Sequence, residues 1–206
     1  MTDTENDLHV IVLAAGASRR FGSPKQLVRV DGRPMLHTAV ANAVSLAGGA
    51  VSVVLGSGAG ELAGLLRHTP ATVVVNRHWE EGMGSSLRTA MSRLPGAPEA
   101  VLVMLADQAA LTLEDLRRLV AGWRRNPDSV VAASYAGIVG PPALFPRRCF
   151  AALGALRGDE GARLLLQREL DTLVRVATPN AAIDIDQPED LLLLEARRRR
   201  SSLQPR

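Results

Sequence analysis

The sequence predicts an α/β protein in which a mostly parallel sheet is covered by helices on both faces, giving three layers. Short apolar runs rich in Val and Leu alternate along the chain with segments of about 10 to 14 residues in helical spacing. The short runs are apolar throughout, which is typical of parallel strands buried on both faces. The chain has 206 residues, of which 47% are hydrophobic, so we expect one domain with a substantial core.

Strand and helix patterns follow one another in order from residue 8 onwards. The first run, LHVIVLAA at 8–15, is apolar and rich in β-branched residues, and it ends at Gly16, so it is read as a buried strand followed by a loop. On the same criterion, strands are expected at 51–55, 72–75 and 101–105, and helices at 34–46, 60–67, 85–94 and 112–123. Ligands of such sheets bind beyond the carboxyl ends of the strands.

After Pro127 the pattern loosens, although the same two kinds of element continue. Strands are expected at 130–135, 143–145 and 173–176, and helices at 160–170 and 188–197. The chain contains no internal repeat and no linker. We therefore expect residues 8–196 to form a single domain.

The basic charge of the chain is concentrated at its carboxyl end. The sequence pI is about 9.9, but five of the 24 basic residues are arginines at 197–206, and without them 19 basic residues face 21 acidic ones. We expect this tail to be disordered and solvated. Aromatic residues make up 3% of the chain, which leaves few rings for stacking on bases, so no nucleic-acid partner is expected.

Two further features bear on the compartment. The longest apolar runs fall far short of the roughly 18 to 20 residues that a membrane-spanning helix needs, and the polar, acidic residues 1–7 read as a flexible N-terminus rather than a signal peptide. The single cysteine, Cys149, cannot form an internal disulfide. A cytoplasmic protein without a membrane partner is expected.

The loop after the first strand carries the first chemical motif, LAAGASRRFGSPKQL at 13–27. Its small residues allow the backbone to approach a ligand, and amide groups of such a loop can cradle phosphates, with Arg19 and Lys25 supplying positive charge. Lys25 is the only lysine in the chain. The spacing is neither that of a Walker A loop nor that of a dinucleotide fingerprint. The alternative is a glycine-bearing surface turn.

Three later segments contain candidate ligand-binding or metal-binding residues next to a predicted strand or helix. In NRHWEEGMGSSL (76–87), Gly82 permits unusual backbone angles, and Ser85 or Ser86 could contact a ligand or simply cap the next helix. Asp107 ends a buried strand, where a carboxylate suits Mg²⁺ bound with nucleotide phosphates, unless it only shapes a turn. In DIDQPEDL (184–191), Asp186 is a candidate second metal ligand, although part of this cluster starts a helix.

Taken together and in order, these segments resemble the molybdenum cofactor cytidylyltransferase family, within the molybdopterin nucleotidyltransferase group. The similarity covers roughly residues 8–196 and continues through GPPALF (140–145) and GDEGAR (158–163). It implies a Rossmann-like nucleotidyltransferase fold.

The separate glycine-rich segment GSGAGE (56–61) has Glu61 where a dinucleotide fingerprint needs its third glycine. It is therefore read as a flexible turn, and a dinucleotide-dependent oxidoreductase is disfavoured.

The resemblance also implies a role for each candidate residue. Arg19, Lys25 and Asp107 would be catalytic, with Arg19 and Lys25 on the triphosphate, and Asp107 and Asp186 would bind Mg²⁺. The residues expected around the nucleotide are Leu13, Ala14, Ala15, Gly16, Arg19, Lys25, Gly82, Ser85, Ser86 and Asp107.

The form Leu-Ala-Ala-Gly and the Gln108 that follows Asp107 resemble the cytidylyl branch of the group. The implied reaction is transfer of CMP from CTP to the terminal phosphate of molybdopterin with release of pyrophosphate, with a molybdenum hydroxylase apo-enzyme as the recipient. Ala109 and Pro141 depart from the pattern, which bears on the acceptor more than on the nucleotide. Alternatives are a guanylyltransferase, a cytidylyltransferase for another small phosphorylated acceptor, and a non-catalytic cofactor-delivery protein.

Overall fold

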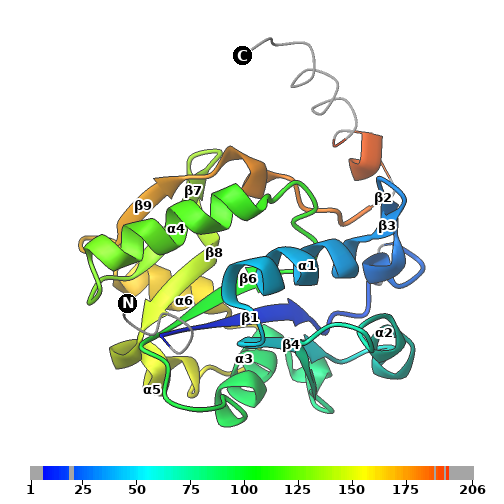
Figure 1. Cartoon of the computed structure of the whole chain (residues 1–206), viewed down its shortest axis with the longest axis horizontal. Helices are drawn as coiled ribbons and strands as arrows, with labels where there is room; N and C mark the ends of the chain where they lie inside the picture. The colour runs from blue at the N-terminus through cyan, green and yellow to red at the C-terminus, as the bar shows by residue number, and fades with distance from the viewer. Residues whose placement is uncertain (1–6, 19–20, 188, 193, 195–206) are drawn as a thin grey trace.

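A computed structural model describes residues 7–18, 21–187, 189–192 and 194 and confirms the three-layer α/β architecture (Figure 1). The strands of the main sheet are β1 (Leu8–Ala14), β4 (Val51–Leu55), β5 (Thr72–Val75), β6 (Ala100–Leu105), β7 (Val131–Tyr135), β8 (Ile138–Pro146) and β9 (Val174–Ala177). The α-helices are α1 (Met35–Ala47), α2 (Ala59–Leu65), α3 (Met83–Ser92), α4 (Leu113–Arg125), α5 (Phe150–Leu153) and α6 (Ala162–Arg168). Short 3₁₀ turns are η1 (Lys25–Leu27), η2 (Trp79–Glu81), η3 (Arg147–Cys149) and η4 (Pro179–Ala182), and β2 (Arg29–Val30) pairs with β3 (Arg33–Pro34) in a small hairpin.

The seven strands of the main sheet lie in the order β5-β4-β1-β6-β8-β7-β9. Only β8 runs antiparallel to its neighbours, β6 and β7, so the sheet is mostly parallel as predicted. From β1 the chain winds outward through β4 to β5 and then returns to place β6 on the other side of β1. A ligand crevice is expected where the winding reverses, at the carboxyl ends of β1 and β6.

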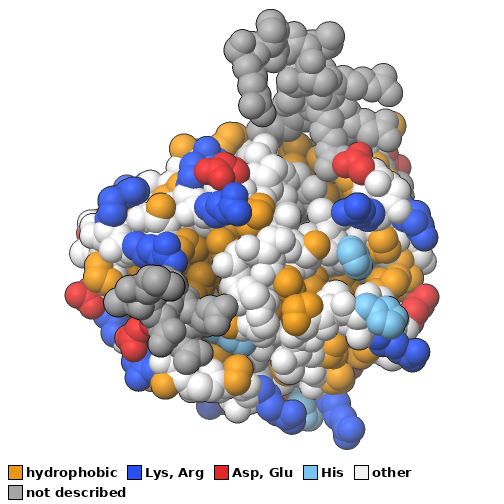
Figure 2. All heavy atoms as spheres, viewed as in Figure 1, with side chains coloured by type: hydrophobic (Ala, Val, Ile, Leu, Met, Phe, Trp, Pro, Cys, Tyr) orange, Lys and Arg blue, Asp and Glu red, His pale blue; other side chains and the backbone are white. Residues whose placement is uncertain are grey.

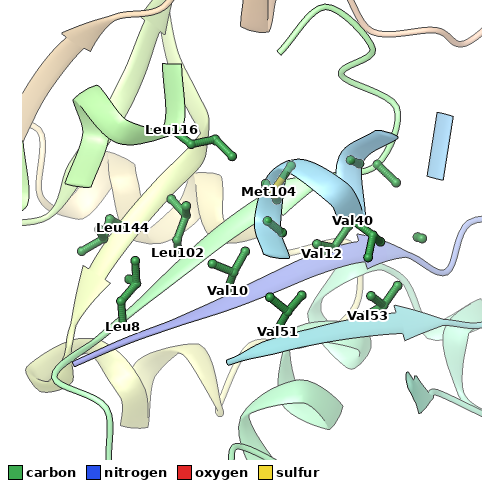
Figure 3. Packing of buried hydrophobic residues seen from close by; sticks show 14 of the residues in the cluster. Leu8, Val10, Val12, Val40, Val51, Val53, Leu102, Met104, Leu116 and Leu144 are labelled. Atoms are coloured by element: carbon green, nitrogen blue, oxygen red, sulfur yellow. The ribbon is translucent and has the colours of Figure 1, made fainter. Parts of the chain in front are cut away.

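Both faces of the sheet are buried, which explains why the strand sequences are apolar throughout. Along β1, Val10 and Val12 join one cluster, with residues of α1 and α4, while Ile11 and Leu13 join a second cluster with residues of α3 and α6. Figure 3 shows the first cluster, in which neighbouring strands present Val and Leu side chains in rows. Two buried faces hold the sheet rigid, so the loops at its carboxyl edge start from fixed positions.

The structure differs from the predicted elements mainly around β8. The strand runs over Ile138–Pro146, longer than the predicted 143–145, because a tight turn at Ala136 and Gly137, both with positive φ, pairs it with β7. The pairing is irregular: Ala132 faces Ala143 whereas Ala133 faces Gly140, so the two intervening prolines of β8 lie outside the regular ladder. Because of these prolines the sequence pattern predicted only the last part of β8, whereas the fold forms the whole strand with a bulge.

Some predicted segments lie partly or wholly outside the described residues. The expected terminal helix at 188–197 is described only at 189–192 and 194, where 190–192 are helical. Residues 1–6 and the arginine-rich segment 197–206 are likewise outside the described part. Helix α5 and the β2–β3 hairpin were not predicted.

The surface of the described residues is mixed in charge. On the face shown in Figure 2, Lys and Arg side chains are scattered around the rim and interspersed with acidic ones. Within the described part of the chain, the structure contains no helix that is long and apolar enough to cross a membrane.

Candidate active site

The loop that leaves β1 is held in shape by a buried glutamine. Gln26 is 4% exposed, and its Nε2 donates hydrogen bonds to the carbonyl oxygens of Ala14 (3.1 Å) and Gly16 (3.0 Å). Its Oε1 accepts from Ser18 Oγ at 3.2 Å, and the same hydroxyl oxygen accepts from the backbone N–H of Lys25 at 3.1 Å. These bonds tie residues 14–18 to residues 25–26, so the described backbone of the loop is preorganised beside the end of the strand.

Lys25 joins the three segments that carry charge. Its Nζ lies 2.7 Å from Asp107 Oδ2 and 2.6 Å from Asp186 Oδ1, so one ammonium bridges two carboxylates. Burial lowers the pKa of Lys25, but the two carboxylates outweigh burial and hold the pKa above its ordinary value. Lys25 is therefore a cation in this site at neutral pH.

The two carboxylates are brought together by packing rather than by nearness in the sequence. Asp107 lies two residues beyond the end of β6, and its carbonyl oxygen accepts a hydrogen bond from the N–H of Ile185 at 3.1 Å. The Ile185 side chain is fully buried with Met35 at the start of α1. Beyond it, the N–H of Asp186 donates to Asp190 Oδ2 at 2.8 Å. This anchoring sets the position of Asp186 opposite Asp107.

A third carboxylate, Asp184, is affected by the same charges. Burial raises the pKa of Asp184 to about 6, and the negative charges of Asp107 and Asp186 add to this. The nearby Lys25 acts in the opposite direction. The end of the sheet therefore holds more negative charge than Lys25 alone neutralises.

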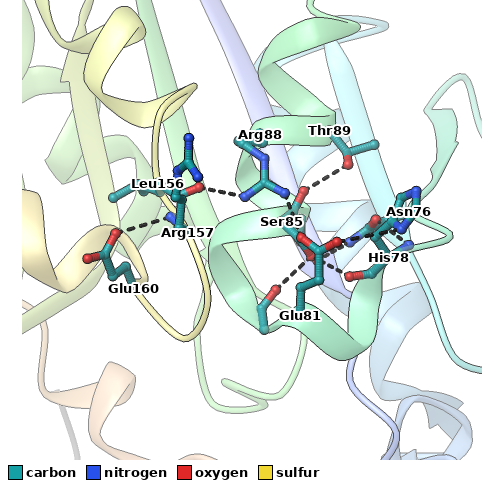
Figure 4. Close-up of polar contacts among 11 residues, drawn as sticks. Asn76, His78, Glu81, Ser85, Arg88, Thr89, Leu156, Arg157 and Glu160 are labelled. Carbon is teal, nitrogen blue, oxygen red and sulfur yellow. Dashed lines mark hydrogen bonds and ion pairs between the residues drawn. The ribbon is translucent and has the colours of Figure 1, made fainter.

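The opposite wall is formed by the turn that leads into α3 (Figure 4). Asn76 is 1% exposed, and its Nδ2 donates to the hydroxyl oxygens of Ser85 (2.8 Å) and Ser86 (3.0 Å). Ser85 Oγ also lies 2.8 Å from the carbonyl oxygens of both His78 and Gly82. Ser85 is thus committed to shaping the turn.

Arg88 joins this turn to the loop at 156–160. Its guanidinium donates to the carbonyl oxygen of Leu156 at 2.7 Å and to Glu81 Oε2 at 2.8 Å (Figure 4). The backbone reinforces the contact, because the N–H of Gly84 donates to the carbonyl oxygen of Gly158 at 2.9 Å. Two segments far apart in the sequence therefore form one wall.

Between these walls lies a cavity of about 590 Å³ at the carboxyl ends of β1 and β6. This volume falls within the range of small-molecule sites. Among the described residues, the cavity is lined by Leu13, Ala14, Ala15, Gly16, Ala17, Ser18, Lys25, Gln26, Met35, Trp79, Glu80, Gly82, Met83, Ser86, Leu105, Ala106, Asp107, Asp159 and Asp186.

The donor set suits a hard divalent cation that is shared with a ligand. Asp107 Oδ1 is buried and has no hydrogen-bond partner among the described residues, while Oδ2 is held by Lys25. The described residues include no group of three or more His, Cys, Asp or Glu side chains arranged to hold a metal ion. Two carboxylates are the usual protein contribution to a Mg²⁺ that takes its other ligands from water and substrate phosphates, so Asp107 and Asp186 fit such an ion.

Comparison with protein families decides the class. The model of the MobA-like NTP transferase domain matches residues 10–173, which include Lys25, Asp107 and the turn into α3 but end before Asp186. The chain belongs to this family. It is a nucleotidyltransferase, and its substrates include a nucleoside triphosphate.

Individual relatives of this MobA-like transferase match over nearly their full length. Nicotine blue oxidoreductase of Paenarthrobacter nicotinovorans is 31% identical over 197 residues, covering 89% of this chain and 94% of the relative. Purine catabolism protein PucB of Bacillus subtilis is 30% identical over 191 residues, covering 87% and 92%. These names describe proteins to which the chain is similar.

Solved structures of one mycobacterial protein support the fold. The crystal structure of Rv0371c from Mycobacterium tuberculosis H37Rv is 27% identical with a TM-score of 0.79, covering 93% of this chain and 98% of that one. A second structure of that protein, a complex with manganese, matches with a TM-score of 0.73 at 26% identity, covering 91% and 97%. The manganese ion belongs to that complex, and what both structures share with this chain is the fold.

The structure gathers most of the residues that the sequence singled out in the MobA-like transferase. Ten positions were expected around the nucleotide, and all of them line the cavity except Ser85, which lies behind the wall, and Arg19, which is outside the described residues. Asp186, expected only as a metal ligand, also lines the cavity. The residues that sequence reasoning missed are Asn76 and Gln26, whose roles depend on backbone and side-chain partners that no motif displays.

Proposed function

We propose that this MobA-like transferase moves CMP from CTP to the terminal phosphate of molybdopterin and releases pyrophosphate. The observation that carries the proposal is the Lys25 ammonium held between Asp107 and Asp186, at the mouth of a preorganised glycine-containing loop. Cations and hard oxygen ligands at that place suit a triphosphate. The Leu13-Ala14-Ala15-Gly16 form and Gln108 favour cytidine over guanosine, by resemblance to the cytidylyl branch.

In the proposed reaction, an oxygen of the acceptor's phosphate attacks the α-phosphorus of CTP. A new P–O bond forms to that oxygen while the bond to the bridging oxygen of pyrophosphate breaks, and pyrophosphate leaves with the electron pair. A phosphate monoester has a second pKa near 6, about the value of a phosphorylated side chain, so the nucleophile is already an anion at neutral pH. The site therefore needs no histidine base.

The residues of the chain act through position and charge. Lys25 would neutralise negative charge that develops on the pyrophosphate, and the loop held by Gln26 would present its amides to the phosphates. Ser86 and Gly82 form the wall against which the nucleoside would lie. A Mg²⁺ held by Asp107 and Asp186 would supply Lewis-acid neutralisation of phosphate oxygens.

The proposal is tested by calorimetric titration of CTP, GTP, ATP and UTP, with and without Mg²⁺, on the wild type and on Asp107→Ala. We expect a magnesium-dependent preference for CTP that the variant loses. Preference for GTP would assign the protein to the guanylyl branch instead. Incubation with CTP and molybdopterin should then release pyrophosphate, and a failure with molybdopterin alone would indicate another phosphorylated acceptor.

Two alternative functions can be distinguished by assays on the same purified protein. A cofactor-delivery protein would bind molybdopterin and a molybdenum hydroxylase apo-enzyme without releasing pyrophosphate. The name of the Paenarthrobacter relative raises oxidoreductase activity, which predicts consumption of NADH or NADPH in a spectrophotometric assay. The glycine-rich segment 56–61 follows β4 and, contrary to the predicted flexible turn, is helical from Ala59, the first residue of α2; Glu61 stands in place of the third glycine. We therefore expect no dinucleotide consumption.

A further inference from the structure

The contact between Lys25 and the two carboxylates has a consequence for metal binding. The Lys25 side chain is 15% exposed, and it reaches across to Asp107, 82 residues away, and to Asp186, 161 residues away. We infer that Lys25 is a placeholder cation, which occupies the place between Asp107 and Asp186 and leaves it when a divalent metal ion binds there, most favourably together with nucleotide. This inference rests on the metal site of the proposed function.

The ammonium and a metal ion cannot use the two carboxylates at the same time. Lys25 Nζ lies 2.7 Å and 2.6 Å from its two acceptor oxygens, whereas Mg²⁺ binds oxygen at about 2.0 to 2.1 Å. A divalent ion joined to both carboxylates would lie in the space that Nζ fills. Repulsion between an ammonium and a divalent cation at such a separation is strong in a partly buried site.

A displaced Lys25 needs a new partner. Leaving the carboxylates breaks two charge-assisted hydrogen bonds, which are the strong class of hydrogen bond. Among the described cavity residues, the other charged side chains are Glu80 and Asp159, which lie on the opposite wall. The phosphates of a nucleotide supply the missing anion. Metal alone should therefore bind weakly, and metal and nucleotide should each raise the affinity for the other.

The decisive variant is Lys25→Met, which keeps an unbranched side chain only one atom shorter and removes its charge. Mn²⁺ binding, measured without nucleotide by the electron paramagnetic resonance signal of free Mn²⁺, should become at least about tenfold tighter than in the wild type. The same variant should bind CTP more weakly. A purely structural role for Lys25 would weaken both, so opposite signs identify the placeholder. Lys25→Met that binds Mn²⁺ no more tightly than the wild type overturns the inference.

Asp107→Asn provides the matched control, because it keeps the shape of the side chain and removes its charge. It should weaken Mn²⁺ binding both alone and in combination with Lys25→Met. If Mn²⁺ binds more tightly to Lys25→Met but is unaffected by Asp107→Asn, the ion lies elsewhere and the inference is wrong. The titration contains neither nucleotide nor acceptor, so it can succeed even where cytidylyl transfer to molybdopterin fails.

A second measurement needs no variant. Because Lys25 is the only lysine, protein grown with lysine carrying ¹³C at Cε gives one lysine side-chain resonance. Addition of Mg²⁺ to saturation should move that resonance, and addition of CTP should move it again as the ammonium meets the phosphates. An unmoved resonance in the presence of bound Mg²⁺ would show that Lys25 keeps its carboxylate partners, contrary to the inference.

Discussion

Lys25 and Asp107 illustrate how much of this site depends on single charged groups. Each is expected to be needed for turnover, because an uncharged side chain at 25 cannot neutralise the phosphates and an uncharged side chain at 107 cannot hold the metal ion of the proposed reaction. Lys25→Ala and Asp107→Ala should each lower the rate of pyrophosphate release by about 10²- to 10³-fold. Steady-state assays with CTP and molybdopterin provide the measurement, and circular dichroism checks folding.

The matched control for these two variants is Asp128→Ala, an exposed aspartate outside the cavity. It should retain the rate of the wild type. Full turnover by both Lys25→Ala and Asp107→Ala, with the fold intact, would show that the catalytic centre lies elsewhere.

Gln26 is another single residue on which the site depends, and it acts by holding backbone carbonyl oxygens. In Gln26→Leu, the side chain keeps its approximate size and loses the two donors that hold the carbonyl oxygens of Ala14 and Gly16. Leaving such groups unpaired should reduce the free energy of unfolding by about 1 to 3 kcal/mol. A loosened loop should also weaken CTP binding by roughly tenfold, since preorganisation is lost.

Denaturant unfolding and calorimetric titration of CTP test this expectation. Gln167→Leu, a substitution of an exposed glutamine in α6, should change neither quantity. An unchanged affinity for CTP in Gln26→Leu would mean that the loop holds its shape without this residue.

At the scale of elements, the turn between η2 and α3 depends on glycine. Gly82 has a φ of +106°, and a Cβ placed there would lie 2.4 Å from the carbonyl oxygen of Gly158. Gly82→Ala therefore meets both backbone strain and a clash with the backbone of the neighbouring loop. We expect it to lower the melting temperature and to weaken nucleotide binding, because the wall of the cavity must move.

Gly64→Ala is the control for this substitution. Gly64 lies in α2, where a Cβ would have open space, so alanine should be neutral or should stabilise the protein by roughly 0.5 to 1 kcal/mol. If Gly82→Ala melts and binds CTP as the wild type does, the turn is more tolerant than its geometry indicates.

The strands also show which secondary-structure elements can be predicted from the sequence pattern. The ranges 51–55 and 72–75 match β4 and β5 because each is a short, mostly apolar run with Gly, Pro or a polar residue within two positions of each end. The antiparallel β8 was predicted too short because Pro141 and Pro142 interrupt the pattern, whereas the fold places them in an irregular part of the ladder. Local composition predicts regular elements, while bulges depend on the partner strand.

At the scale of the whole molecule, acid should unfold the protein through a buried histidine. His9 in β1 is 3% exposed, and its Nε2 lies 2.8 Å from Ser52 Oγ in β4. Burial lowers the pKa of His9 to about 4, from about 6.5 in the unfolded chain. Between these two pH values the unfolded chain binds more protons than the folded one, so stability falls as the pH is lowered.

The free energy of unfolding should drop by about 3 kcal/mol from this group as the pH falls from about 6.5 to about 4, and should level off below that. Urea unfolding of the wild type and of His9→Gln over this range measures the contribution. His9→Gln should lose this part of the pH dependence, whereas His68→Gln at an exposed position should retain it. Parallel pH profiles for all three proteins would contradict the role of His9.

The sequence by itself determined the fold class, the position of the loop after β1, and the residue types that meet at the site. It could do so because buried parallel strands need continuous apolar runs and because phosphate chemistry needs small residues, cations and carboxylates in the loops that follow them. Lys25, Asp107 and Asp186 were recognisable for this reason.

The tertiary structure alone decided how these residues meet. The bridge from Lys25 to Asp107 and Asp186 joins positions that are 82 and 161 residues apart, and sequence spacing carries no information about such distances. Only the structure shows that Ser86 lines the cavity, whereas Ser85 lies behind the wall and holds the turn. Both outcomes follow from packing, because the buried sheet and the buried Ile185 fix where each loop begins and ends.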